Sequence, residues 1–150
     1  MLHQLKYYLI HRVKSIHLHG IHSPFIFKFN RECLQDARDH AAYLELSRFR
    51  ESVLNHPQQL QIEDHGSGSK ILKDNSRNTT DILRHNCSTC KRTELLFRVA
   101  SYLEVDRALE LGTSLGVGTA ALALGSNSVT SIEGSGDIYR YALERLEENN

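Results

Sequence analysis

The feature that most constrains the fold of this chain is a glycine-rich loop between two segments of different character. Ala108-Leu-Glu-Leu111 is a short apolar run typical of a buried strand, and Gly112-Thr-Ser-Leu-Gly-Val-Gly118 follows it directly. Residues 119–124 are rich in alanine and leucine, which favours a helix. Residues 128–132 predict a second strand, and Glu133 follows it. This order is typical of the first half of a doubly wound α/β sheet.

The first hundred residues carry helical signals instead. Ser23 and Pro24 are an expected N-cap and first helical position, because proline has no N–H to leave unpaired there. The alternation of Phe25, Phe27 and Phe29 also fits a strand, so both interpretations of that segment stay open. The expected helices cover about residues 2–16, 24–34, 41–54, 79–85, 89–103 and, beyond the second strand, 138–146.

These elements predict two regions in the chain. Residues 1–104 are expected to form an all-helical N-terminal extension, and residues 105–150 the N-terminal half of an α/β domain. Two parallel strands alone do not make a sheet that is covered on both faces, as parallel sheets require. We therefore expect a sequence truncated at Asn150, or one that needs partner strands, as in a homo-oligomer.

Composition limits the classes of partner. The 150 residues carry no net charge when the histidines are neutral, so we expect no nucleic-acid partner and no membrane partner. The first 16 residues lack an apolar run long enough for a signal peptide or a membrane span, which predicts a cytoplasmic protein. Cys33, Cys87 and Cys90 are too few and too unevenly spaced for a secreted disulfide framework, so reduced thiols are expected.

The glycine loop points to a ligand site. Gly112 permits a sharp turn and a close approach of a ligand to the backbone, while Gly116 and Gly118 allow the helix start to pack against the strand. Free N–H groups at that helix start favour a carboxylate or phosphate. Glu110 adds a negative charge, which suits a ligand that also carries cationic groups. Glu133, at the tip of the next strand, predicts a carboxylate that accepts the hydroxyl protons of a ribose.

These residues match a known family pattern. Leu109-Glu-Leu-Gly-Thr-Ser-Leu-Gly-Val-Gly-Thr-Ala120 resembles motif I of class I S-adenosylmethionine-dependent methyltransferases, and Ser131-Ile-Glu-Gly134 is similar to motif II of their O-methyltransferase-like branch. Further stretches resemble a bacterial subgroup of these enzymes that has a helical N-terminal extension. They are His19-Gly-Ile-His-Ser-Pro-Phe25, Glu63-Asp-His-Gly-Ser-Gly-Ser69 and Leu95-Leu-Phe-Arg98.

The resemblance implies a Rossmann-like methyltransferase fold, present as its first β-α-β-α units, and S-adenosyl-L-methionine as the cofactor. It implies methyl transfer to an oxygen of a small-molecule acceptor. The residues that it implies for cofactor binding are Glu110, Gly112, Thr113, Ser114 and Gly116 around the methionine end, and Glu133 with Gly134 at the ribose. The later strands of the family would carry most substrate contacts, so no catalytic base is assigned.

Other interpretations use the same residues. The spacing of Gly112, Gly116 and Gly118 also fits the NAD loop of short-chain dehydrogenases. That loop, however, usually lies near the start of the chain and has no acidic residue two positions before its first glycine, where this chain has Glu110. A non-catalytic, truncated product is a further alternative.

No metal site is predicted. His17, His19 and His22 lie in an expected loop without a carboxylate nearby, and Cys87-Ser-Thr-Cys90 lacks the second pair that a zinc ribbon needs. The charged segment Glu144-Arg-Leu-Glu-Glu148 is interpreted as a solvated helix face.

Overall fold

A computed structural model describes residues 2–15, 20, 22–62 and 76–149. The chain forms two compact units, Met1–Asp36 and Ala37–Asn150. The second unit contains the predicted glycine loop. The loop segment Glu63 to Ser69, and the histidines at 17 and 19, lie outside the described residues.

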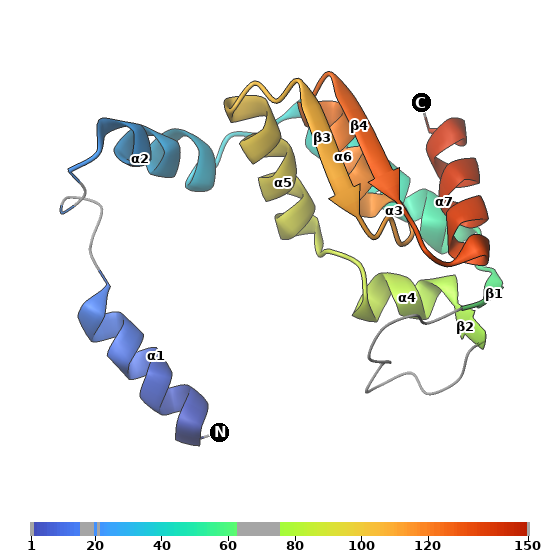
Figure 1. Cartoon of the computed structure of the whole chain (residues 1–150), viewed down its shortest axis with the longest axis horizontal. Coiled ribbons are helices and arrows are strands. Elements are labelled where there is room, and N and C mark those ends of the chain that lie inside the picture. Colours follow the sequence, from blue (N-terminus) through green and yellow to red (C-terminus); the bar gives the residue numbers. More distant parts are fainter. Residues whose placement is uncertain (1, 16–19, 21, 63–75, 150) are drawn as a thin grey trace. The chain divides into compact units, whose positions relative to one another are not determined.

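The first unit consists of short helices (Figure 1): α1 (Leu2–Lys14), α2 (Pro24–Phe29) and a π-helical turn η2 (Asn30–Leu34). The predicted cap is confirmed, since the Ser23 hydroxyl accepts a hydrogen bond from the Ile26 N–H at 3.4 Å. The segment is therefore a helix and not the alternative strand. Phe25 and Phe29 stack one turn apart, with ring centroids 6.0 Å apart.

The helices of the second unit agree with their predicted positions to within a few residues. They are α3 (Ala41–Asn55), α4 (Thr79–His85), α5 (Cys90–Tyr102), α6 (Val117–Gly125) and α7 (Gly136–Glu148). Leu46, Phe49 and Val53 recur at three- and four-residue steps along α3 and are all buried. Phe49 and Val53 belong to the main core, which also contains Leu115 and Tyr141.

The prediction of an all-helical region before residue 105 is wrong. Strands β1 (Gln59–Gln61) and β2 (Ser76–Asn78) pair antiparallel, with Leu60 opposite Arg77. Leu60 is buried between two exposed glutamines, the alternation that a half-buried strand requires. Each strand has only three residues, and their pairing spans the segment of residues 62–75 that lies between them. Local periodicity therefore gave no sign of the sheet.

The second sheet contains β3 (Arg107–Leu111) and β4 (Ser128–Ile132), which are parallel and pair Glu110 with Ser131. Helix α6 connects them and lies behind the sheet in Figure 1. The predicted strand–loop–helix–strand–helix order is thus confirmed, and the chain is a mixed helix and sheet structure. On the opposite face of the sheet, the side chains of Leu109, Leu111 and Ile132 are exposed.

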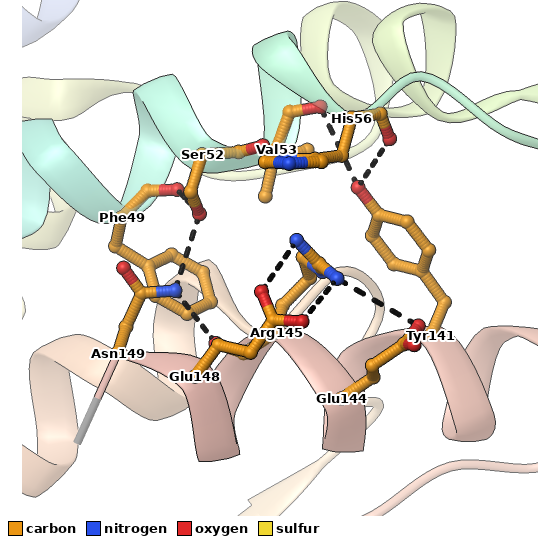
Figure 2. A network of polar contacts seen from close by, with 9 residues as sticks. All are labelled: Phe49, Ser52, Val53, His56, Tyr141, Glu144, Arg145, Glu148 and Asn149. Atoms are coloured by element: carbon orange, nitrogen blue, oxygen red, sulfur yellow. Dashed lines mark hydrogen bonds and ion pairs between the residues drawn. The ribbon is translucent and has the colours of Figure 1, made fainter.

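Helix α7 is fixed to α3 by a polar network (Figure 2). The Tyr141 hydroxyl donates to the His56 carbonyl at 3.2 Å, and burial raises the Tyr141 pKa above its usual 10.0. Arg145 is buried, its Nη2 donates to Glu148 Oε1 at 2.8 Å, and its Nη1 forms an ion pair with Oε2 at 2.8 Å. The interpretation of residues 144–148 as a solvated face is therefore wrong for Arg145, since its side chain turns inward between α7 and α3.

No helix in the described ranges has both the length and the apolar character needed to cross a membrane.

Candidate functional site

The glycine loop lies at the carboxyl ends of β3 and β4. The N–H groups of Gly112 and Thr113 both donate to the Ile132 carbonyl, at 2.8 and 3.3 Å, which ties the start of the loop to the end of β4. Gly112 and Gly116 have φ values of +94° and +82°, which only glycine adopts freely. Ser114 also has a positive φ of +49°, a conformation that costs a non-glycine residue about 1 kcal/mol or more and that often marks a ligand site.

The three loop glycines have different surroundings. A Cβ atom built on Gly112 would meet no atom within 4 Å, so open space lies beside this turn. At Gly116 a Cβ would press against Phe49 and Leu146, each at 3.2 Å, so this glycine lies in a tight contact with the core. At Gly118 a Cβ would overlap Oε1 of Glu110. Gly112 is therefore the position in the loop that leaves room for a ligand.

Glu110 points into the first turn of α6. Its Oε2 accepts hydrogen bonds from the hydroxyls of Thr119 at 2.5 Å and Ser131 at 2.7 Å. The Ser131 hydroxyl also lies 2.6 Å from that of Thr113. Because Ser131 gives its only proton to the carboxylate, Thr113 is the donor in that contact. The Thr113 hydroxyl therefore keeps only acceptor positions for any ligand.

Glu133 joins the glycine loop to the start of α7. Its Oε2 accepts the Ser114 N–H at 2.8 Å, and its Oε1 accepts the N–H groups of Gly134 and Ser135 at 2.9 and 3.0 Å. A carboxylate has about four acceptor positions, so one remains. The buried hydroxyl of Ser135 has no hydrogen-bond partner within the described part of the chain. The tip of β4 thus holds both an acceptor and a donor with unused capacity.

Every predicted cofactor residue belongs to this loop or to the strand ends beside it, and hydrogen bonds connect most of them. Glu110, Thr113 and Ser131 form one group, while Ser114, Glu133 and Gly134 form another. The sequence-based expectation placed Ser114 at the methionine end and Glu133 at the ribose, whereas a hydrogen bond joins these two residues. It also missed Ser131 and Thr119 as the partners of Glu110. A hydroxyl residue one turn into the helix, facing an acid on the strand, is the signal that could have identified Thr119.

Cys87 is a further residue that sequence reasoning missed. Its Sγ lies 3.5 Å from the Ser114 hydroxyl, so the segment between α4 and α5 contacts the loop. Cys90 is the first residue of α5 and is exposed. No group of three His, Cys, Asp or Glu side chains that could hold a metal is found among the described residues, and His22 is exposed.

A separate cavity of about 430 Å³ lies between α3, α6 and α7. Phe49, Ala120 and Leu146 contribute apolar side chains to its wall, and Glu45 and Arg48 contribute charged ones. It includes none of the predicted cofactor residues, so it is distinct from the loop at the strand ends.

The loop arrangement can bind an anionic group at the start of α6 and a hydroxyl or N–H donor at Glu133 or Thr113. Comparison of the chain with protein-family models, with curated proteins and with solved structures finds no match.

Proposed function

We propose that this chain binds S-adenosyl-L-methionine at the loop of Gly112 to Gly116 and at Glu133, and that it serves methyl transfer to the oxygen of a small molecule. The observation that carries the proposal is the open space beside Gly112, in a loop whose Ser114 N–H is held by the carboxylate at the tip of β4. A strand–glycine loop–helix unit with an acid on the next strand is the arrangement on which nucleoside cofactors bind in Rossmann-like folds.

The chain's own residues fit the two ends of this cofactor. Gly112 leaves the backbone accessible, and the N–H groups at the start of α6 favour a carboxylate. Thr113 offers only acceptor positions, which suit an ammonium group. The free acceptor position of Glu133 suits a ribose hydroxyl. The bound cofactor supplies a methyl group already activated by its sulfonium, so the task of the chain is to position it.

The rival cofactor is a nicotinamide dinucleotide. Glu110 places its carboxylate beside the first turn of α6, where Oε1 approaches Gly118. A negative charge at that position opposes any anion on the same helix start, a carboxylate as well as a pyrophosphate, and only a ligand that also carries cationic groups offsets it. The charge therefore favours the sulfonium- and ammonium-bearing ligand over the dinucleotide.

Calorimetric titration of the chain with S-adenosylhomocysteine, and in parallel with NAD, tests the proposal. We expect the homocysteine nucleoside to bind and NAD not to bind. In the Glu133→Ala variant the dissociation constant should rise by about tenfold or more, the scale of a lost charged hydrogen bond. Glu147→Ala removes an exposed carboxylate on α7 and is the matched control, with unchanged affinity.

Thermal unfolding of both variants separates loss of the site from loss of the fold, because Glu133 also holds three backbone N–H groups. NAD binding alone would replace the methyltransferase proposal with the dehydrogenase one. A folded chain that binds neither ligand contradicts both.

A further inference from the structure

One face of α1 is apolar and exposed. Leu5, Leu9 and Val13 follow each other at four-residue steps, so they lie along a single stripe of the helix. Their exposed fractions are 56%, 55% and 85%, and Tyr8 and Ile10, which are also exposed, lie farther round the helix on its two sides. A helix of 13 residues is marginal by itself in water. A partner that covers this face would therefore stabilise α1.

The charges around this face all have the same sign. At 100° per residue, Lys6 and Arg12 lie on opposite flanks of the stripe, and α1 contains no acidic residue. The first 31 residues of the chain hold five Lys or Arg and no Asp or Glu. The remaining residues hold 13 Lys or Arg and 18 Asp or Glu, so they carry the opposite charge. The zero net charge of the whole chain conceals this segregation.

We propose that α1 binds the surface of an anionic phospholipid bilayer, with its axis in the plane of the interface. Leu5, Leu9 and Val13 would enter the boundary between headgroups and acyl chains. The long side chains of Lys6 and Arg12 would reach the lipid phosphates from the rims of the apolar face. At 1.5 Å per residue a helix of this length is too short to span the bilayer, so it lies on the surface.

Two other occupants fit the face less well. A second copy of α1, packed face to face, would bring the cationic rims of both helices together, and like charges across an interface are unfavourable. A nucleic acid would pair its phosphates with the cationic side chains, but it would not bury the leucines, because proteins bind the phosphate backbone through charge. The sequence-based expectation of no membrane partner rested on net charge alone, and the charge of α1 differs from that of the whole chain.

Flotation with vesicles tests the proposal on the full chain. One set of vesicles contains equal parts of phosphatidylglycerol and phosphatidylcholine, and the other contains phosphatidylcholine alone. We expect binding to the anionic vesicles only, and weaker binding as salt is raised. The double variant Leu5→Gln, Leu9→Gln should lower the partition coefficient by about tenfold or more, because two half-exposed leucines no longer enter the lipid.

The matched control is His3→Gln, His11→Gln, two changes on the polar side of the same helix, which should leave partitioning at neutral pH within about twofold. Light scattering without lipid, and filter binding to a homopolymeric RNA, complete the test. The proposal is overturned by absence of vesicle binding, by equal binding to both vesicles, or by equal partitioning of the two double variants. Self-association that the leucine variant abolishes, or binding to RNA in place of vesicles, would assign the face to those partners instead.

Discussion

Replacing Gly118 with alanine tests whether this position must lack a side chain to leave room for the Glu110 carboxylate. The new methyl group would overlap Glu110 Oε1, so the carboxylate must move by about 1 Å to reach an ordinary contact distance. Its bonds from Thr119 and Ser131, at 2.5 and 2.7 Å, would then be stretched or broken. Hydrogen bonds to a charged group contribute about 1.5–3 kcal/mol each. Alanine returns up to about 1 kcal/mol through its higher helix propensity. We expect a net loss of about 1–3 kcal/mol.

Urea unfolding of a double-mutant cycle measures this effect. In a Glu110→Ala background the obstructing oxygen is absent, so Gly118→Ala should be neutral or slightly stabilising. The coupling energy between the two positions should be about 2 kcal/mol. Gly136→Ala is the control, since its Cβ would meet only Arg140 at 3.8 Å and should cost little. Equal effects of Gly118→Ala in both backgrounds would refute the reasoning, because they would show that the carboxylate does not feel the methyl group.

Three further predictions concern the helices around the site. Tyr141→Phe should cost about 1 kcal/mol in urea unfolding, because a buried hydroxyl bond is lost. Because burial raises the Tyr141 pKa, this tyrosine ionises first in the unfolded chain, and the wild type should lose stability as pH rises above 10.0. The variant should lack this contribution to the fall of unfolding free energy at alkaline pH. Glu148→Gln removes the nearer of the two carboxylates beside the buried Arg145 and should destabilise by about 1–3 kcal/mol, whereas Glu147→Gln should not. Equal stability of the two variants would show that Arg145 does not depend on Glu148. Gly125→Ala would set a methyl group 2.8 Å from a carbonyl oxygen of α5 and should lower the unfolding free energy by about 1–3 kcal/mol. An unchanged midpoint of urea unfolding would indicate that α5 and α6 can move apart to accommodate it.

Much of the second unit could be predicted from the sequence because its signals are local. Strand β4 and helix α4 have the predicted bounds, and β3 differs by one residue. Alternation, helical periodicity and a glycine after an apolar run act over a few neighbouring residues. Strands β1 and β2 could not be predicted in this way, because each has three residues and is stable only when paired with the other across residues 62–75.

Arg145 shows the same limit for side chains. In sequence it lies among glutamates, which is the pattern of a solvated helix face. In the structure it is buried between α7 and α3, with its charge met by Glu148 one turn later on the same helix. The pairing is local, but the burial depends on where α3 packs. Position 145 continues the buried stripe of Ile138, Tyr141 and Ala142, so helical spacing indicates its inward face, but arginine is not an expected core residue.

The glycine loop shows what a motif can and cannot establish about function. A Cβ at Gly116 would crowd Phe49 and Leu146, and one at Gly118 would overlap Glu110, so two of the three glycines make close contacts within the protein. Only Gly112 combines a positive φ with open space beside it. The repeated glycines therefore predict the loop conformation, which methyltransferases and dehydrogenases share, more strongly than they predict the ligand. The choice of ligand rests on charge: the Glu110 carboxylate beside the start of α6 and the Thr113 hydroxyl that can only accept. Both favour a ligand with a cationic donor, and neither would be needed for a dinucleotide.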